Sequence, residues 1–353
     1  MAGIRVHDGV AAALNGFQLP EKLGFGLVTA PVMFSARYDG RWDDGELLPY
    51  GPIELLPGAR ALHYAELVFE GMKAYRVGHD RPSLFRADAN YARLARSAAR
   101  LAIHAPPREL FLDALHALVR ACTPLIPRVS GQSLYLRPFL FGTEPGYHIR
   151  PSETVRFMVI ANPAEVYSSG PMKVAIERTD SRASPGGTGV AKTGGNYAAS
   201  LRATRVAAER GYTVALWLDA TTRTRIQELS GMNLFAVING ELHTPALDGA
   251  ILEGITRDSL LTLARADGYR VVERPMDINE LIASVQSGEC TELFACGTAA
   301  IVSPIGVLGE ADGSEFVPRD VDRVAAVLRE RLLAIQERRS PDPFGWVTEV
   351  PEA

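Results

Sequence analysis

The segment PGGTGVAKTGGNYA, residues 185–198, places a single lysine in a glycine-rich loop just before an expected helix. Glycines let the backbone approach a ligand closely, and Asn196 can cap the helix that follows. Lys192 comes after Val190 and Ala191, so we expect its amine to be partly desolvated and close to the positive end of the helix dipole. Both effects favour the neutral, nucleophilic form of an amine. The segment therefore predicts a bound cofactor and a Schiff-base lysine.

Lysine is rare in this chain, which makes each one informative. Of the 37 basic residues only four are lysines, Lys22, Lys73, Lys173 and Lys192, and the rest are arginines. The two cations largely replace one another in surface pairing, but only lysine loses its proton near neutrality and attacks a carbonyl. A codon usage that favours arginine explains why lysine is scarce, and Lys22 and Lys173 are then present by chance. The neighbours of Lys192 set it apart.

The same loop is also close to a phosphate-binding motif. GGTGVAKT, starting at Gly186, differs by one residue from G-x-x-x-x-G-K-[ST], and LWLD at 216–219 resembles a strand end that holds Mg²⁺. Ala191 stands where that motif needs a glycine, however, and Gly194 and Gly195 fall where its helix begins. A nucleotide triphosphatase is therefore disfavoured, and a flexible glycine-rich surface loop is the other alternative.

The pattern of expected elements indicates an α+β protein of two domains. With 353 residues, 47% of them hydrophobic, the chain is long enough for two globular cores. Its apolar patterning predicts strands at 32–38, 133–142 and 155–163 and an amphipathic helix at 109–126. A small N-terminal α+β domain is expected at 1–163, a connection at 164–171, and a larger barrel-like domain at 172–353. The elements lack the steady βαβ alternation of a doubly wound sheet.

Charge, cysteine use and hydropathy exclude several classes of protein. With 41 acidic and 37 basic residues and no run of like charge, the chain has no basic stripe for nucleic acid. Its three cysteines, Cys122, Cys290 and Cys296, are odd in number and widely spaced, as expected for reduced thiols. No signal-peptide pattern and no apolar run of about 18 residues appears. We therefore expect a cytoplasmic protein that neither binds nucleic acid nor spans a membrane.

Three other places have features of ligand binding. GIT at 254–256 opens an expected helix, where free N–H groups bind phosphate. GTA at 297–299 follows an expected strand in a turn that offers more free N–H groups. Glu228, in the apolar string ELSGMNLF, is expected to be a semi-buried carboxylate. Two anion sites suit a phosphorylated cofactor and a carboxylate substrate, whereas the seven histidines form no metal-like cluster.

These segments belong to an ordered series that resembles one known family. The series consists of FEGMKAYR (69–76), NYAR (90–93), YLRP (135–138), PGGTGVAKTGGNYA (185–198), ELSGMNLF (228–235), GITR (254–257) and ACGTA (295–299). It resembles the branched-chain aminotransferases, pyridoxal-phosphate enzymes of fold type IV, over about residues 25–345. The resemblance implies a small α+β domain, a larger barrel-like domain, pyridoxal 5'-phosphate where they meet, and a homodimer that completes each site.

The resemblance also implies roles for individual residues toward the cofactor. Lys192 becomes the Schiff-base lysine, and Tyr197 becomes the partner of the cofactor's ring hydroxyl. Glu228 becomes the carboxylate on the pyridine nitrogen, which keeps that nitrogen protonated so that the ring accepts electrons. The phosphate is expected on a guanidinium, a helix start and a turn, namely Arg93, Ile255, Thr256 and Thr298.

The substrate site implied by the resemblance has two parts. The substrate carboxylate is expected at Tyr64, Arg137 and the backbone of Thr298 and Ala299. The apolar side chain of the substrate is expected among three aromatic rings, those of Phe25, Phe69 and Tyr135.

Two departures from the family pattern affect what the resemblance implies. Asp180 and Ser181 stand where an aromatic and an aliphatic residue are usual. If they lie at the mouth of the substrate pocket, Asp180 repels the second carboxylate of glutamate. Ala300 and Ser303 stand where mammalian members have a Cys-x-x-Cys pair, so we expect no thiol-based redox control.

The function that follows is transamination of leucine, isoleucine or valine with 2-oxoglutarate. Lys192 is expected to move a proton as general base and then as general acid. D-amino-acid transaminases and aminodeoxychorismate lyases are the alternatives within the same fold. A non-catalytic amino-acid-binding protein is the alternative from another class, and it is disfavoured because binding alone needs no lysine in this loop.

Overall fold

The computed structural model describes residues 3–166 and 170–352, which form two compact units. Unit 1 comprises Met1–Tyr167, Ala191–Gly194 and Ala334–Ala353, and unit 2 comprises Ser168–Val190 and Gly195–Leu333. The segment around Lys192 and the C-terminal residues thus group with unit 1, whereas all of 172–353 was expected to form one domain. Residues 167–169 of the expected connection lie outside the described residues, and the domain boundaries stay a prediction.

Unit 1 contains a largely antiparallel sheet in the order β1-β3-β2-β8-β7-β5-β6-β18, with β4 also paired to β7. The strands that precede the connection in sequence are β1 (Arg5–Val6), β2 (Val32–Asp39), β3 (Glu46–Pro49), β4 (Leu67–Phe69), β5 (Met72–Tyr75), β6 (Ser83–Phe85), β7 (Ser133–Gly142) and β8 (Thr154–Ala164). β18 (Val347–Glu349) comes from the C-terminus and pairs with β6. The three strands expected at 32–38, 133–142 and 155–163 are present.

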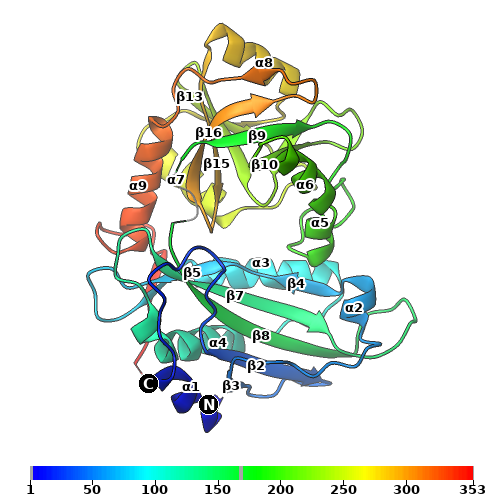
Figure 1. Ribbon diagram of the computed structural model, residues 1–353, viewed down its shortest axis with the longest axis vertical. Coiled ribbons are helices and arrows are strands. Elements are labelled where there is room, and N and C mark those ends of the chain that lie inside the picture. Colours follow the sequence, from blue (N-terminus) through cyan, green and yellow to red (C-terminus); the bar gives the residue numbers. More distant parts are fainter. Residues whose placement is uncertain (1–2, 167–169, 353) are drawn as a thin grey trace. The chain divides into compact units, whose positions relative to one another are not determined.

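Helices α1 (Gly9–Asn15), α3 (Ala87–Arg100) and α4 (Arg108–Ala121) share one apolar core with this sheet (Figure 1). The short helix α2 (Arg60–Tyr64) contacts β7, and the 3-10 turn η1 (Thr123–Leu125) follows α4. α4 packs on β2 and β8 through an apolar face that includes the fully buried Phe111, Leu115 and Leu118. The helix expected at 109–126 is shorter than predicted because Pro124 lacks the N–H that would continue it.

Unit 2 is built on a second sheet, in the order β11-β10-β9-β16-β15-β12-β13-β14, with β17 on β16. Its strands are β9 (Met172–Glu177), β10 (Val214–Leu218), β11 (Ile226–Leu229), β12 (Asn233–Ile238), β13 (Glu241–Pro245), β14 (Val271–Arg274), β15 (Cys290–Gly297), β16 (Ile301–Gly309) and β17 (Glu315–Phe316). The end strand β11 also contacts β12 and β13, so the sheet curls back on itself. The α+β class and the barrel-like second sheet are confirmed.

The remaining helices are α5 (Gly194–Ala198), α6 (Leu201–Glu209), α7 (Ile255–Ala266), α8 (Ile278–Ser287) and α9 (Val324–Gln336). The helix expected after the glycine-rich loop, with Asn196 as its cap, is instead two helices, and Asn196 lies within the first of them, α5. Ser200 causes the break, because its backbone N–H and its hydroxyl both donate to the carbonyl of Tyr197, at 3.0 and 2.7 Å. Across the described ranges, no helix has both the length and the apolar character needed to cross a membrane.

Candidate active site

The backbone around Lys192 is tied to unit 1. The Lys192 N–H donates to Ser97 Oγ on α3 at 2.9 Å, and the Phe69 N–H on β4 donates to the Lys192 carbonyl at 2.9 Å. Thr193 Oγ1 donates to the carbonyl of Leu67 at 2.7 Å. The lysine therefore sits on an ordered strand edge, two residues before α5 begins at Gly194. This position differs from a phosphate-binding loop, in which the lysine itself opens the helix.

The structure brings four of the predicted substrate residues together with Lys192. Lys192 Nζ lies 4.9 Å from the centroid of the Phe69 ring, and the Arg137 guanidinium carbon lies 4.7 Å from the same ring. Arg137 Nη2 donates to the Tyr135 hydroxyl at 3.0 Å, and the Tyr135 and Phe25 rings meet edge to face with centroids 5.0 Å apart. An amine, a guanidinium and three aromatic rings thus share one site.

Two details of this cluster favour an anionic ligand with an apolar group. Arg137 Nε is buried and has no hydrogen-bond partner in the described part of the chain. A buried donor without a partner costs roughly 1–3 kcal/mol, which a carboxylate ligand would offset. Gly71 makes the tight packing possible, because a Cβ at this position would lie 2.1 Å from the Tyr135 hydroxyl oxygen.

Arg93, the predicted phosphate ligand, forms a buried bidentate pair with Glu70. Nε donates to Oε1 at 2.7 Å, and Nη2 donates to Oε2 at 2.8 Å. Burial raises the pKa of the Glu70 carboxyl, but the charges of Arg93 and Lys192 and the hydrogen bonds from Arg93 and Asn90 outweigh it and hold that pKa below its usual range. Glu70 was not predicted from the sequence, although it follows Phe69 directly in the quoted string FEGMKAYR.

Tyr64 lies elsewhere in unit 1, at the end of α2. Its hydroxyl donates to the carbonyl of Tyr147 at 2.6 Å, and its side chain is 43% exposed. The ring of Tyr147 meets His63 edge to face, with centroids 5.2 Å apart. Tyr64 therefore belongs to an exposed aromatic group formed by α2 and the loop after β7, and its predicted contact with a substrate stays a prediction.

In unit 2, Glu228 on β11 is the buried carboxylate that the sequence led us to expect. It is 4% exposed and pairs with Arg182, whose Nη2 lies 3.0 Å from Oε1. Oε2 accepts from the Leu252 N–H at 3.0 Å and from Asn233 Nδ2 at 3.4 Å. Neither Arg182 nor Asn233 was predicted from the sequence. Their positions in the sequence could have identified them: Arg182 lies just before the glycine-rich loop, and Asn233 lies within ELSGMNLF.

Asn233 connects Glu228 to the start of α7. Asn233 Nδ2 also donates to the Leu252 carbonyl at 3.0 Å, and a Cβ at Gly254 would lie 2.0 Å from Asn233 Oδ1. Gly254 is the N-cap of α7, so the predicted phosphate ligands Ile255 and Thr256 form its first turn. Backbone N–H groups at a helix start are suited to an anion.

The predicted turn at Thr298 and Ala299 follows β15 at the same part of unit 2. Gly297, the last residue of β15, lies close to the turn at Gly231, because a Cβ at Gly297 would stand 3.4 Å from the Gly231 carbonyl oxygen. The ring of Tyr197 is also near this turn, 4.0 Å from where a Cβ at Gly231 would stand.

A strained residue follows that turn. Ile301 has φ of 62°, although it is β-branched and buried. This left-handed conformation is unfavourable for a β-branched residue and persists only where the surroundings impose it. The strain indicates that packing, rather than local preference, determines the course of the chain after Ala299.

Asp180 pairs with Arg202 in unit 2. Its carboxylate accepts from Arg202 Nε at 2.9 Å and also from Arg202 Nη2. The hydrogen bond from Arg202 and the charge of that residue lower the pKa of Asp180. Its expected place at the mouth of the substrate pocket, and its effect on glutamate, stay predictions.

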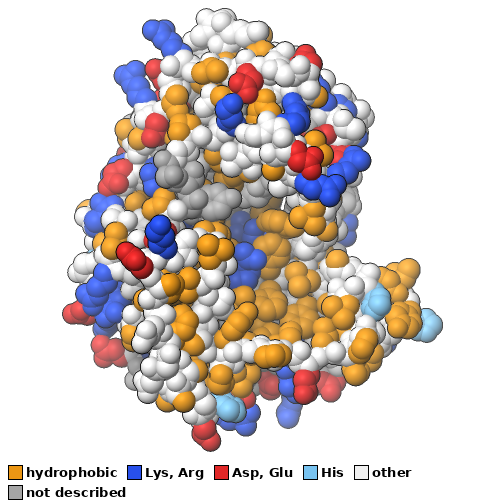
Figure 2. Space-filling view, in the orientation of Figure 1, with side chains coloured by type: hydrophobic (Ala, Val, Ile, Leu, Met, Phe, Trp, Pro, Cys, Tyr) orange, Lys and Arg blue, Asp and Glu red, His pale blue; other side chains and the backbone are white. Residues whose placement is uncertain are grey.

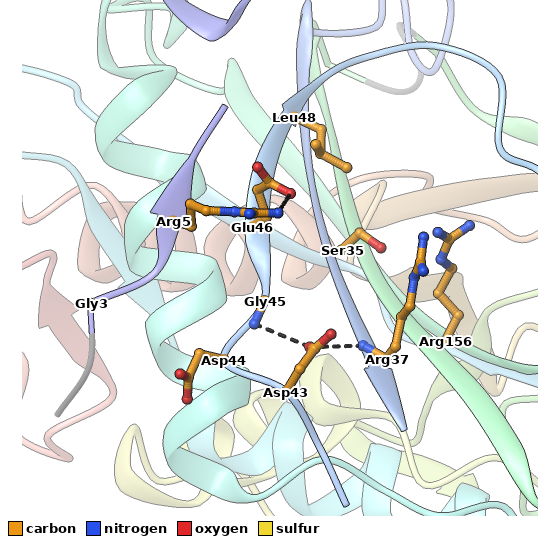
Figure 3. A pocket seen from close by; sticks show the side chains of 10 residues that line it. All are labelled: Gly3, Arg5, Ser35, Arg37, Asp43, Asp44, Gly45, Glu46, Leu48 and Arg156. Carbon is orange, nitrogen blue, oxygen red and sulfur yellow. Dashed lines mark hydrogen bonds and ion pairs between the residues drawn. The ribbon is translucent and has the colours of Figure 1, made fainter. Parts of the chain in front are cut away.

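A pocket of about 400 Å³ lies elsewhere, on unit 1 near β1 and β3 (Figure 3). It is lined by Gly3, Arg5, Ser35, Arg37, Asp43, Asp44, Gly45, Glu46, Leu48 and Arg156, none of which is a predicted site residue. Arg5 pairs with Glu46 at 2.6 Å, and Asp43 accepts from the backbone N–H of Arg37 at 2.9 Å. Three arginines face three carboxylates, so this pocket has no dominant charge. Within residues 3–166 and 170–352, no group of three or more His, Cys, Asp or Glu could hold a metal ion.

Comparison with known proteins agrees with this geometry. The profile of the Amino-transferase class IV family matches residues 67–307. A branched-chain-amino-acid aminotransferase of Mycolicibacterium smegmatis is 45% identical over 336 residues, which cover 92% of this chain and 91% of that protein. The structure of a branched-chain aminotransferase from Thermoproteus uzoniensis with norvaline has a TM-score of 0.74 and 27% identity, and covers 91% of this chain and 100% of that one. A branched-chain amino acid aminotransferase of T.th., complexed with N-(5'-phosphopyridoxyl)-L-glutamate, has a TM-score of 0.74 and 28% identity, and covers 92% of this chain and 100% of that one.

Proposed function

The chain belongs to the Amino-transferase class IV family, and we infer that it transaminates leucine, isoleucine and valine with 2-oxoglutarate, using pyridoxal 5'-phosphate. The observation that carries this inference is the cluster in which the Lys192 amine and the Arg137 guanidinium stack on the same Phe69 ring. The cluster supplies a nucleophile, a carboxylate binder and an apolar surface, which are the three things an amino-acid substrate of this kind requires.

The proposed cofactor ligands fit the chemistry of pyridoxal phosphate. When bound, this cofactor acts as an electron sink for the α-carbon of the substrate. Guanidinium and backbone N–H donors suit its phosphate, and we assign them to Arg93, Ile255, Thr256 and Thr298. The Glu228 carboxylate suits the pyridine nitrogen, and the Tyr197 hydroxyl suits the ring hydroxyl. Arg182 balances Glu228 and keeps it in place.

Lys192 is proposed to have two roles. Its Nζ would hold the cofactor covalently. With substrate bound, the same nitrogen would take the proton from the α-carbon of the substrate as a general base and deliver it again as a general acid. The hydrogen bonds with Ser97 and Phe69 hold the backbone of Lys192 in place, so only its side chain needs to move.

The substrate side chain is proposed to rest on Phe25, Phe69 and Tyr135, with the substrate carboxylate at Arg137. Each buried methylene contributes about 0.8 kcal/mol, which favours branched aliphatic side chains. Relatives accept two kinds of ligand, since one solved structure holds norvaline and another a phosphopyridoxyl adduct of glutamate. We propose that the Tyr135 hydroxyl and Arg137 provide donors for the second carboxylate of glutamate.

We also propose that the chain works as a homodimer in the cytoplasm. Beside its main core, unit 1 has a second apolar cluster, in which half-buried Leu48, Leu55, Ala61, Leu67, Phe139 and Ile160 surround the buried Met33, Phe141 and Met158. Figure 2 shows hydrophobic side chains gathered at the surface in the lower part of the view. Contiguous apolar patches of this kind mark interaction surfaces. In a dimer the exposed Tyr64 would complete the site of the other subunit, and light scattering should give twice 38.2 kDa. The three cysteines are free and buried, as expected in a reducing compartment.

A substrate comparison tests the proposed function and its alternatives together. The cofactor-loaded protein is given 2-oxoglutarate with L-leucine, L-isoleucine, L-valine or D-leucine, and glutamate formation is measured. We expect turnover with the three L-amino acids and none with D-leucine. Turnover of D-leucine would indicate a D-amino-acid transaminase. Binding of L-leucine without any glutamate would indicate a binding protein.

A further inference from the structure

Glu70 is the acidic residue of the Lys192 neighbourhood to which the proposed function gives no role. It is fully buried, with 0% exposure, and directly follows Phe69, whose ring contacts both the Lys192 amine and the Arg137 guanidinium. Its carboxylate faces two positive groups, since both Arg93 and Lys192 stabilise its charge. A carboxylate this close to a proposed phosphate site repels the phosphate, so its presence needs a reason.

The geometry of the Glu70–Arg93 pair supplies one. Nε and Nη2 of Arg93 donate to the two carboxylate oxygens at 2.7 and 2.8 Å, so carboxylate and guanidinium form a planar, two-point contact. Such a contact restricts rotation of the guanidinium about its last bonds, which a single hydrogen bond would not. The contact with Glu70 therefore determines the orientation of the Arg93 guanidinium.

Glu70 is itself held on several sides. Asn90, one helical turn before Arg93 on α3, donates to Oε2 at 2.7 Å. The Gly71 N–H donates to the same oxygen at 3.2 Å, and the Glu70 N–H donates to the Pro138 carbonyl at 2.7 Å. Glu70, directly after β4, is therefore fixed to β7 through its backbone and to α3 through its carboxylate.

We propose that Glu70 is a positioning residue that fixes the Arg93 guanidinium in the orientation needed to bind the phosphate of the cofactor. This proposal rests on the proposed function, because it takes the ligand of Arg93 to be pyridoxal phosphate. It assigns to Glu70 no contact with substrate or cofactor. The cost in repulsion is outweighed because a preorganised guanidinium loses less entropy when the phosphate binds.

Two ligands that differ only in the phosphate test the proposal. Apoprotein is titrated with pyridoxal 5'-phosphate and with pyridoxal, and the ratio of the two dissociation constants is compared between wild type and Glu70→Gln, which keeps the size but not the two-oxygen charge. We expect the substitution to weaken binding of the phosphate form by about tenfold, while pyridoxal binding changes little. Arg93→Lys changes the phosphate ligand itself as well as the two-point contact, so it should shift the ratio at least as far, and adding Glu70→Gln to Arg93→Lys should shift it no further.

Each other outcome overturns the proposal. If both ligands weaken equally, Glu70 only supports the fold. If the phosphate form binds more tightly, the repulsion dominates and positioning is unimportant. Glu337→Gln is the matched control, because Glu337 is also a fully buried carboxylate of unit 1 but binds Ser130 and Gly131, and its ratio should equal that of wild type. Failure of wild type to bind pyridoxal phosphate at all would count against the proposed function instead.

Discussion

Two buried ion pairs in this protein join residues that are far apart in the sequence. Glu228 and Arg182 form one such pair, and Glu70 and Arg93 form another. Burying a charge without a partner is costly, so each carboxylate needs its arginine even before any ligand is present. One member of each pair, Glu228 or Arg93, is proposed to hold the cofactor, so stability and function are coupled at both pairs.

Glu228→Gln should therefore affect two properties differently. Without cofactor, removing one charge leaves Arg182 buried and poorly compensated, which should lower the free energy of unfolding by about 3 kcal/mol. With cofactor, the loss of negative charge beside the pyridine nitrogen should slow removal of the α-proton more than it weakens cofactor binding. Denaturant unfolding of the apoprotein and pre-steady-state absorbance with L-leucine measure the two effects.

The contrary result for Glu228 is equally clear. If the variant loses stability but removes the α-proton at the wild-type rate, the carboxylate is structural and the assignment to the pyridine nitrogen is wrong. Arg182→Gln is the matched variant, because it breaks the same pair from the other side and leaves the carboxylate in place.

The sequence predicted the groups that carry distinctive chemistry and missed their supporting partners. Lys192 stands out through its loop and the scarcity of lysine, and Phe69 and Arg137 stand out through their motifs. Glu70, Arg182 and Asn233 have no such signal of their own, because an ion pair or an amide bridge between distant residues exists only once the chain has folded.

At the scale of helices and strands, local pattern predicted long elements well and short ones poorly. β7 and β8 follow the expected runs closely, since each has about ten residues of continuous apolar pattern. The segment at 62–77 contains the end of α2 and the short strands β4 and β5, which its apolar pattern alone does not separate. Short elements depend on tertiary partners such as the Glu66 and Arg60 side chains, and local sequence does not show these partners.

The buried carboxyl of Glu66 predicts that the free energy of unfolding depends on pH. It stands between α2 and β4, its Oε1 accepts from the Ser152 N–H at 2.8 Å, and its Oε2 is buried without a hydrogen-bond partner in the described chain. Burial raises the pKa of this carboxyl above its usual value of 4.5. For an acid with a raised pKa in the folded state, the stabilising contribution is complete below the unfolded pKa and is lost as the pH rises through the folded pKa.

Wild type should therefore lose stability relative to Glu66→Gln, which resembles the protonated acid, as the pH rises above about 4.5. Urea unfolding of both proteins at several pH values between 5 and 8 measures the difference between them, which cancels the titration of all other groups. A difference that stays constant over this range would mean that Glu66 is ionised as easily in the folded protein as in the unfolded one.

At the scale of the whole molecule, the resemblance predicted the class of fold correctly, and composition alone would not have done so. Length and hydrophobicity allow many two-domain proteins. In unit 2, β9 pairs in parallel with both β10 and β16, and in unit 1 the C-terminal strand β18 joins a sheet formed by the first half of the chain. Such long-range pairings leave no local pattern, so only the ordered series of motifs pointed to them.

The central claim is that Lys192 carries the cofactor, and reduction of the loaded protein tests it most directly. Borohydride makes the bond between lysine and cofactor permanent, and peptide mass mapping then identifies the labelled residue among the four lysines. Lys73 is the informative rival, because it is buried on β5 of the same unit. The account predicts label on Lys192 alone, and none in Lys192→Ala. Label on Lys73, or label that persists in Lys192→Ala, would contradict it.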